Sequence, residues 1–255
     1  MSSERLKETI QTALRVFGVE LRRAAATVDA FGVQKELVTK AEPVIFDVGA
    51  HVGSVALKYR ALFPRAAIWC FEPFAPSFHK LQQSLASDRR MSCHNLAVSD
   101  AKGRAVLNAN LASVTNSLLP SDERGSSYWG EGLLNTTDQV EVSTTTIDDF
   151  VVENSIGEID ILKLDVQGAE FKVLTGATNT LRRQQVALLY TEMIMCPTYK
   201  GQHEFHDYLK FLGSLGYEML DLFNAERSGR QLIQADVIFL SSSFKEQLRR
   251  SVPGN

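Results

Sequence analysis

Short apolar runs alternate with stretches of helical periodicity from Pro43 onward, a pattern typical of βαβ units around a mostly parallel sheet. Between the first three runs, the spacing of apolar residues predicts helices over Val52–Leu62 and Ser77–Ala86. Seven strands are predicted, over Val44–Val48, Ala67–Phe71, Ser92–Leu96, Ile159–Leu164, Val186–Thr191, Tyr217–Leu222 and Ala235–Leu240. The pattern therefore predicts an α/β fold.

The stretch Ala101–Ser143 lacks this alternation and is rich in Asn, Ser, Thr and Gly. We expect one added strand over Arg104–Asn108, followed by a polar loop with the sequence NSLLPSDERGSSYWGEG. Loops longer than about 12–15 residues inside a compact domain are usually functional or disordered. The region 108–132 is therefore interpreted as a candidate lid that faces the substrate.

The first 42 residues are predicted to form a helical appendage or lid, ahead of a main domain over residues 43–242 and a tail over 243–255. Apolar residues recur at helical spacing at Leu6, Ile10, Leu14, Phe17 and Leu21. Neighbouring basic residues would suit a membrane surface, but nearby glutamates favour a helix that packs on the protein. Phe17 and Leu21 would equally suit a second subunit, so a homodimer stays open as an alternative.

The composition narrows the class of protein. Of the 255 residues, 44% are hydrophobic and 22% charged, which indicates a globular protein with a sizeable core. The 27 Lys and Arg against 30 Asp and Glu give a net charge of −3, so no overall positive field attracts nucleic acid. The sequence has no apolar run of about 18 residues to span a membrane and no signal-peptide pattern. These features predict a cytoplasmic protein without a membrane span.

The sequence argues against disulfide bonds and against a bound metal ion. The three cysteines, Cys70, Cys93 and Cys196, are far apart and odd in number, which argues against a disulfide framework and a CxxC zinc site. His203 and His206 would reach a metal together with Asp165, but no third ligand is clearly placed. We interpret the two histidines as a solvated helix start and predict no metal cofactor.

The segment VIFDVGAHVGS combines a hydrophobic strand, an acid at its end, and two glycines that open a helix. Gly49 and Gly53 allow close approach of a ligand to backbone amides, which indicates a nucleotide-like cofactor. The carboxylate of Asp47 would repel a pyrophosphate and attract a cation, so it favours S-adenosylmethionine over NAD. The same turn also occurs in α/β domains that bind no nucleotide.

Two further strand ends suit an adenosine group. Glu72 follows Gly49 by 23 positions at the end of the second strand, where a carboxylate accepts ribose hydroxyls. The third strand leads into NLAVSD, Asn95 to Asp100, whose small residues leave room for an adenine ring. Because any turn after a strand would look similar, NLAVSD is weak evidence for an adenine site.

Polar residues also end the fourth and fifth predicted strands. Lys163 and Asp165 share one face of a strand, and burial without partners would cost several kcal/mol, so we expect them to pair with each other or with an acid from the next strand. Glu192 reaches the same sheet edge. Glu170 falls in the first turn of the helix that follows the fourth strand. Its charge would either complement the positive end of the helix dipole or contact a ligand. The alternative that Lys163 and Asp165 form a purely structural ion pair stays open.

Taken together, the motifs VGAHVG, CFEPF, NLAVSD, LKLDVQGAE, YTEM, TYKGQ and QADVIF resemble the FkbM-type family of class I S-adenosylmethionine-dependent methyltransferases, over roughly Val44–Leu240. The resemblance implies a three-layer Rossmann-like sheet of seven strands with the last strand antiparallel. It also implies methyl transfer, usually to a hydroxyl oxygen of a sugar or natural-product scaffold.

The resemblance assigns roles by position. The cofactor would be held by Asp47, Gly49, Ala50, His51, Gly53, Glu72, Pro73, Asn95, Ala97, Val98 and Asp165. Asp165 resembles the acid beside the reactive methyl group. Many members have Asn in place of His51 and Glu in place of Gln167, so this chain departs from the pattern at both positions.

The expected reaction is attack of an acceptor hydroxyl on the sulfonium methyl group, which leaves S-adenosylhomocysteine. Asp165 first and Glu192 second are candidates to remove the proton or orient the hydroxyl, with Lys163 setting their charge state. Methylation of a nitrogen or a carboxylate on a small molecule is an alternative that the sequence does not separate. A non-catalytic binding protein and an NAD-dependent oxidoreductase are the remaining alternatives.

Overall fold

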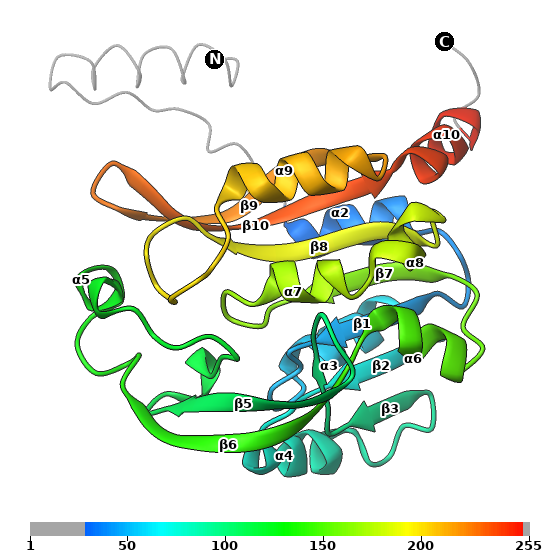
Figure 1. Cartoon of the computed structure of the whole chain (residues 1–255). Helices are drawn as coiled ribbons and strands as arrows, with labels where there is room; N and C mark the ends of the chain where they lie inside the picture. Colours follow the sequence, from blue (N-terminus) through cyan, green and yellow to red (C-terminus); the bar gives the residue numbers. More distant parts are fainter. Residues whose placement is uncertain (1–28, 252–255) are drawn as a thin grey trace, which may run out of the picture.

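The structure, a computed structural model, describes residues 29–251 (Figure 1). The helix predicted over Leu6–Leu21 lies outside the described residues. A seven-stranded sheet forms the centre, with the strand order β3-β2-β1-β7-β8-β10-β9. Its strands are β1 Val44–Val48, β2 Ala67–Phe71, β3 Met91–His94, β7 Ile159–Leu164, β8 Val186–Ile194, β9 Tyr217–Ser228 and β10 Gln231–Ser241.

Strand β10 runs antiparallel to both of its neighbours, β8 and β9, whereas the pairs β1·β2, β1·β7, β2·β3 and β7·β8 are parallel. The predicted class I sheet, mostly parallel with the last strand antiparallel, is confirmed. The predicted third strand, Ser92–Leu96, is shifted: β3 ends at His94 because the chain turns there toward a second sheet.

Helices cover both faces of the sheet, which gives three layers. Alternating side chains along each strand point to opposite faces, so Phe46 packs in one core and its neighbour Ile45 in the other. The first core is closed by α6 Ile147–Glu153, α7 Glu170–Thr175, α8 Thr178–Arg182 and α9 Phe205–Ser214. The second is closed by α2 Ala30–Leu37, α3 Ser54–Leu62, α4 Ala75–Leu85 and α10 Ser242–Ser251.

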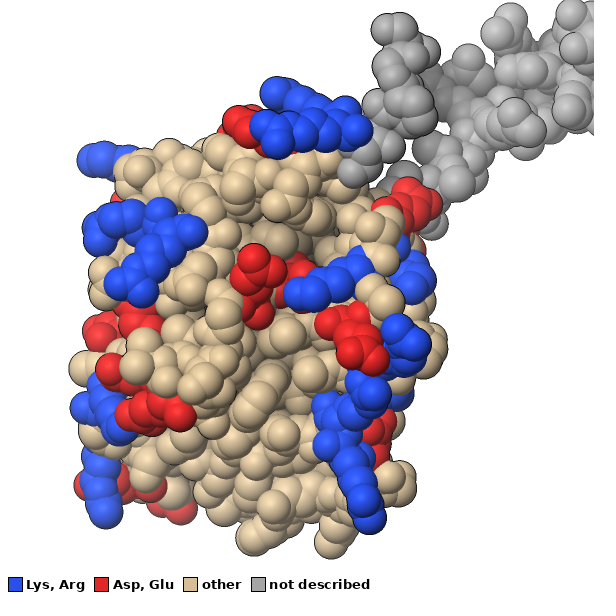
Figure 2. Space-filling view, turned by 90° about the vertical axis from the view of Figure 1, so that its right-hand side faces the viewer, with Lys and Arg blue, Asp and Glu red and all other residues tan. Residues whose placement is uncertain are grey.

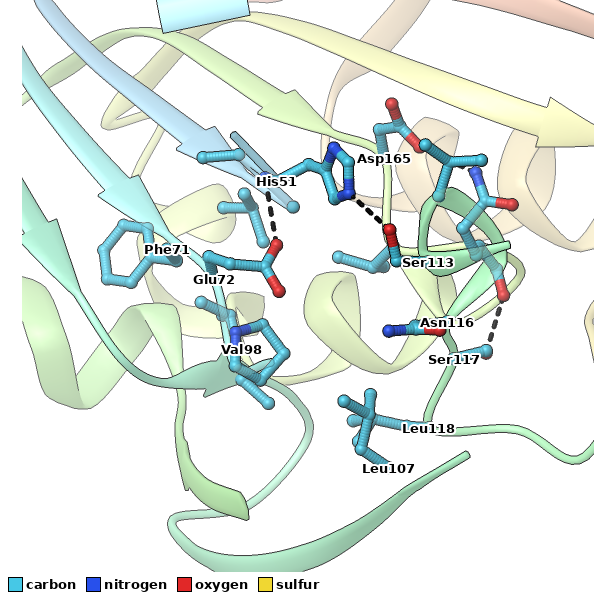
Figure 3. A pocket seen from close by; sticks show the side chains of 18 of the residues that line it. His51, Phe71, Glu72, Val98, Leu107, Ser113, Asn116, Ser117, Leu118 and Asp165 are labelled. Carbon is cyan, nitrogen blue, oxygen red and sulfur yellow. Dashed lines mark hydrogen bonds between the residues drawn. The ribbon is translucent and has the colours of Figure 1, made fainter. Parts of the chain in front are cut away.

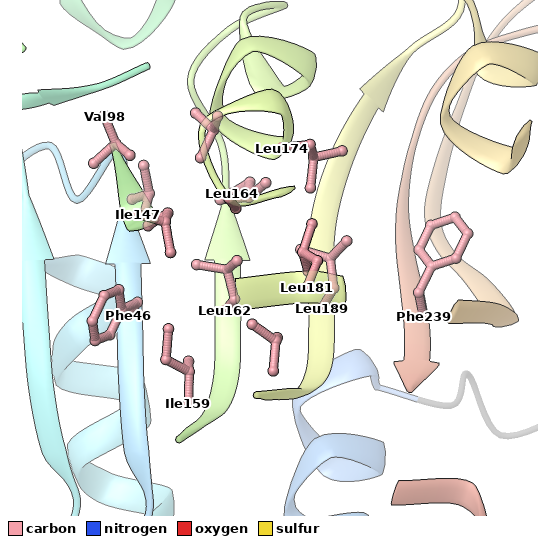
Figure 4. Packing of buried hydrophobic residues seen from close by; sticks show 14 of the residues in the cluster. Phe46, Val98, Ile147, Ile159, Leu162, Leu164, Leu174, Leu181, Leu189 and Phe239 are labelled. Carbon is pink, nitrogen blue, oxygen red and sulfur yellow. The ribbon is translucent and has the colours of Figure 1, made fainter. Parts of the chain in front are cut away.

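The first core is the larger of the two clusters and lies under the α6–α9 layer (Figure 4). Phe46, Leu162 and Leu189 come from three neighbouring strands and are fully buried, and Ile147 and Leu174 cover them from the helices. Burial of each such side chain contributes about 1.5–3 kcal/mol. This packing fixes the strand ends, on which the candidate site depends.

Helix α2 packs closely although it belongs to the predicted appendage. The ring of Phe31 lies 5.2 Å from that of Tyr59 and 5.6 Å from that of Tyr190. The hydroxyl of Tyr59 donates to Gln34 Oε1 at 2.8 Å. At the other end, Phe244 of α10 packs against the same core. The domain boundaries at residues 42 and 242 stay predictions.

A second sheet, in the order β4-β6-β5, stands beside the first, and it is absent from the sequence-based expectation. It consists of β4 Ala97–Val98, β5 Gly103–Asn110 and β6 Thr136–Thr145, and between β5 and β6 lie η1 Ser113–Thr115, η2 Glu123–Gly125 and α5 Ser126–Trp129. The prediction of one added strand was therefore incomplete. Only Val140 and Val142 of β6 join an apolar cluster, so β6 has no apolar run of the kind from which the other strands were predicted.

Basic and acidic side chains are interspersed on the face shown in Figure 2. Exposed pairs in the structure include Lys102 with Glu153 and Arg104 with Glu141. Such pairs contribute only about 0–1 kcal/mol each. Within residues 29–251, no helix has the length and apolar character needed to cross a membrane.

Candidate functional site

A cavity of about 280 Å³ opens at the edge of the large sheet where its parallel strands end (Figure 3). This volume is near the lower end of the range for ligand pockets, about 300–1,000 Å³. The predicted site residues that line it are Gly49, Ala50, His51, Glu72, Pro73, Ala97, Val98, Lys163 and Asp165. Four others lie outside its lining, namely Asp47, Gly53, Asn95 and Glu192.

The glycine loop after β1 lies directly against the loop after β7. Gly49 has a φ of 79°, and a Cβ atom there would lie 1.8 Å from the carbonyl oxygen of Asp165. The amides of Gly49 and Ala50 both donate to the carbonyl of Phe71 at 3.0 Å. Glycine is therefore required at position 49 by close approach of two backbones as well as by its φ.

Glu72 is held by the backbone at the end of β2. Its Oε2 accepts from the amide of His51 at 2.9 Å, and its Oε1 accepts from the amide of Phe74 at 2.8 Å. Asn95 Nδ2 donates to the carbonyls of Glu72 and Pro73, both at 2.9 Å, so Asn95 supports this turn from outside the cavity. Burial raises the pKa of Glu72 to about 7, although the two backbone donors oppose that rise.

Replacement of Glu72 by Gln is expected to change how stability depends on pH. The pKa of Glu72 rises from an ordinary value of 4.5 to about 7 on folding, so its contribution to stability is full below pH 4.5 and is lost as the pH rises through 7. Glutamine does not titrate. The free energy of unfolding of Glu72→Gln, measured by urea denaturation from pH 4.5 to 8, should therefore gain up to about 3 kcal/mol relative to wild type.

The buried Glu170 and Glu192 titrate in both proteins, so their contributions cancel from this comparison. Replacement of the exposed Glu131 by Gln is the control, and its curve should run parallel to that of wild type. A parallel curve for Glu72→Gln as well would contradict the raised pKa of Glu72.

An apolar slot adjoins Glu72. Ala97 and Val98, which form β4, line one side of it, and Pro73 follows Glu72. Leu107 of β5 and Leu118 lie on the facing side (Figure 3). The second sheet thus completes a cavity that the large sheet begins.

Lys163 is the centre of a buried charge cluster. Its Nζ lies 3.0 Å from Asp47 Oδ1 and 3.5 Å from Asp165 Oδ2, and it donates to the carbonyl of Gly49 at 3.1 Å. The side chains of Lys163 and Asp47 are 4% and 0% exposed. Burial alone would lower the pKa of Lys163, but the charges of Asp47 and Asp165 outweigh it and raise that pKa. Asp47 therefore holds Lys163 behind the glycine loop.

Asp165 presents a carboxylate to the cavity with a side chain 38% exposed. Its Oδ1 accepts from Gln167 Nε2 at 2.9 Å, and the same amide group donates to Glu192 Oε2 at 2.9 Å. Gln234 Nε2 donates to the other oxygen of Glu192 at 2.7 Å. Burial, with the charges of Asp165 and Glu170, raises the pKa of Glu192 well above its usual range. Glu192 thus acts on Asp165 through Gln167 and does not reach the cavity itself.

Tyr199 was not predicted from the sequence and belongs to the same network. Its hydroxyl lies 3.0 Å from both Gln167 Oε1 and the carbonyl of Thr115. Glu170 supports the loop from the other side, because its Oε1 accepts from the amides of Val166 and Gly168 at 2.8 and 3.3 Å. Glu170 therefore orders the β7–α7 loop and is not part of the cavity lining.

His51 joins the glycine loop to the polar region after β5. Its Nε2 shares a 2.9 Å hydrogen bond with Ser113 Oγ, and its ring lies beside Asp165 (Figure 3). Burial, together with the positive charge of Lys80, lowers the pKa of His51 despite the opposing charge of Asp165. Ser113, Asn116 and Ser117 line the cavity but were missed individually. In the sequence, only the length of the polar region 108–132 indicated that residues there belong to the site.

His203 and His206 lie at the start of α9, away from the cavity lining. His203 Nδ1 is 3.2 Å from Asp207 Oδ2, and His206 Nδ1 is 3.3 Å from Glu204 Oε2. Among residues 29–251, no three His, Cys, Asp or Glu side chains are grouped so that they could hold a metal ion.

The charges and shape of the cavity fit S-adenosylmethionine. Glu72 would hold the ribose as an acceptor, and the apolar slot would take the adenine ring. Asp47 and Asp165 carry two negative charges against one positive charge on Lys163, which leaves one net negative charge beside the glycine loop. A sulfonium ligand is attracted there and a pyrophosphate is repelled.

Comparison with known proteins identifies the family and several relatives of this chain. The sequence model of the Methyltransferase FkbM domain matches residues 47–219. The chain is 28% identical over 239 residues to the 2-O-methyltransferase NoeI of Sinorhizobium fredii, which covers 91% of this chain and 95% of that protein. It is 28% identical over 152 residues to the 31-O-demethyl-FK506 methyltransferase FkbM of Streptomyces tacrolimicus, covering 52% and 58% of the two chains. A solved structure, magnesium protoporphyrin IX methyltransferase from Synechocystis with bound SAM, aligns with a TM-score of 0.43 and 13% identity over 83% and 77% of the chains.

Proposed function

Because this chain belongs to the FkbM methyltransferase family, whose members are S-adenosylmethionine-dependent enzymes, we propose that it methylates a hydroxyl oxygen of a sugar or natural-product small molecule. One observation carries the proposal: Glu72 and Asp165 present carboxylates to the same cavity, one suited to the ribose and one to the acceptor. Two relatives, a 2-O-methyltransferase and a 31-O-demethyl-FK506 methyltransferase, support oxygen as the acceptor atom.

The protein's part in this reaction is orientation and proton handling. S-adenosylmethionine supplies an activated methyl group, so a C–O bond forms as the C–S bond breaks and the electron pair stays on sulfur. The acceptor hydroxyl must lose its proton, and Asp165 is the carboxylate placed to orient or accept it. Gln167 and Lys163 fix the two oxygens of Asp165. Glu192 is assigned a positioning role through Gln167.

Calorimetry with S-adenosylhomocysteine is the first test. We expect one binding site per chain and no heat with NAD. Absence of S-adenosylhomocysteine binding would favour a non-catalytic binding protein, and binding of NAD would favour an oxidoreductase. Mass spectrometry of the methylated product then separates O-methylation from transfer to nitrogen or a carboxylate, and a methylated amine would contradict the proposal.

A further inference from the structure

The segment Ser113–Leu118 forms the wall of the cavity that faces Glu72, and contacts from both sheets hold it in place. Ser117 Oγ donates to the carbonyl of Gln167 at 2.7 Å, and the amide of Asn108 donates to the carbonyl of Ser117 at 2.8 Å. The hydroxyl of Tyr199 donates to the carbonyl of Thr115 at 3.0 Å. The wall is therefore a preformed surface whose side chains have fixed directions.

One donor on this wall has no partner. Asn116 Oδ1 accepts from the amide of Asn110 at 2.8 Å, which fixes the orientation of the side-chain amide. Its Nδ2 is buried and makes no hydrogen bond to any atom of residues 29–251. Figure 3 shows this nitrogen turned into the cavity, across from Val98. Buried donors are almost always satisfied, so an acceptor on a bound ligand is expected at this point.

The surroundings of Asn116 identify the kind of acceptor. Val98, Leu107 and Leu118 line the end of the cavity away from His51, and all three are aliphatic, whereas Ser113 and Glu72 lie toward His51 (Figure 3). A carboxylate or a set of hydroxyls would need several polar partners there. A flat heteroaromatic ring needs apolar faces and one in-plane donor for a ring nitrogen. The slot therefore matches a nucleobase.

We propose that Asn116 recognises the nucleobase of the cofactor, with Nδ2 donating to a ring nitrogen of adenine between β4 and the wall. This inference rests on the proposed function, since it requires an adenosine ligand in the cavity. It assigns the region between β5 and β6 a role in cofactor selection, whereas the sequence indicated a lid for the substrate.

Calorimetry with S-adenosylhomocysteine on two variants tests the proposal. Asn116→Asp keeps an oxygen to accept from the Asn110 amide but places a second oxygen against the ring nitrogen, so affinity should fall about 10- to 100-fold. Asn116→Ala removes the donor, together with the oxygen that accepts from the Asn110 amide, and should weaken binding about fivefold. Asn135→Asp makes the same charge change at an exposed position outside the cavity lining and should stay within about twofold of wild type. Thermal unfolding verifies that each variant is folded.

Deaza analogues of S-adenosylhomocysteine, which lack N1, N3 or N7 in turn, supply a second measurement. One of the three should bind wild type more weakly than the parent compound, and Asn116→Ala should bind that analogue and the parent equally. An Asn116→Asp variant that binds like wild type, or an analogue preference unchanged by Asn116→Ala, would overturn the inference. Failure of wild type to bind S-adenosylhomocysteine at all would instead remove the proposed function.

Discussion

Replacement of Lys163 by methionine is expected to lower the free energy of unfolding by about 3–5 kcal/mol. Methionine fills a similar volume but leaves the carboxylate of Asp47, which is 0% exposed and 3.0 Å from Nζ, without its counter-charge. The carbonyl of Gly49 loses a donor in the same change. Urea denaturation at pH 7 measures the loss.

A double variant separates loss of the pair from loss of packing. In Lys163→Met with Asp47→Asn, no buried charge remains unpaired, so a large part of the lost stability should return. The exposed pair of Lys102 and Glu153 is the control, and Lys102→Met should cost about 0–1 kcal/mol. A double variant as unstable as the sum of its single variants would show that the ion pair is not what stabilises this position.

Replacement of Asp165 by Asn is expected to reduce turnover by about 10²–10⁴-fold, the range of a positioned base, with S-adenosylhomocysteine affinity within a few-fold of wild type. The amide keeps the shape of the side chain but loses the negative charge that would orient the acceptor hydroxyl and take its proton. The initial rate of S-adenosylhomocysteine formation, with the acceptor that wild type methylates, measures the loss.

Asp100→Asn is the matched control, because Asp100 is exposed to a similar degree and also pairs with a lysine, Lys172, at 3.1 Å. Its turnover should equal that of wild type. If Asp165→Asn instead lost cofactor affinity and kept its turnover at saturation, Asp165 would belong to the cofactor site alone.

The centre of the fold was predictable because its strands are continuous apolar runs. The predicted bounds of β1, β2 and β7 agree with the structure, because strands buried on both faces are near-continuous hydrophobic runs in the sequence. The convergence of Glu72 and Asp165 followed from the rule that ligands bind beyond the carboxyl ends of parallel strands. Both residues line the cavity, as that rule predicts.

The remaining parts of the site depend on contacts that no local pattern encodes. The nearest partner of Lys163 is Asp47, which stands opposite it in the β1·β7 register, whereas the sequence indicated Asp165 or an acid from the next strand. The contact between Tyr199 and Gln167 joins positions 32 residues apart, and that between Tyr199 and Thr115 joins positions 84 apart. The first pair meets where the chain segments after the neighbouring strands β7 and β8 come together, and the second only when the β5–β6 region folds back onto the large sheet.

Contact between Gly49 and the loop after β7 limits how far the two loops can move relative to each other. The amide of Asp165 also donates to the carbonyl of Val48 at 3.1 Å, so the two loops meet through backbone on both sides. These contacts hold the two loops at one separation, so under the proposed function the main chain would set the distance between the methyl donor and Asp165. Under the proposed function, a change of acceptor would then require new side chains around the cavity, because these two loops would not move apart to admit it.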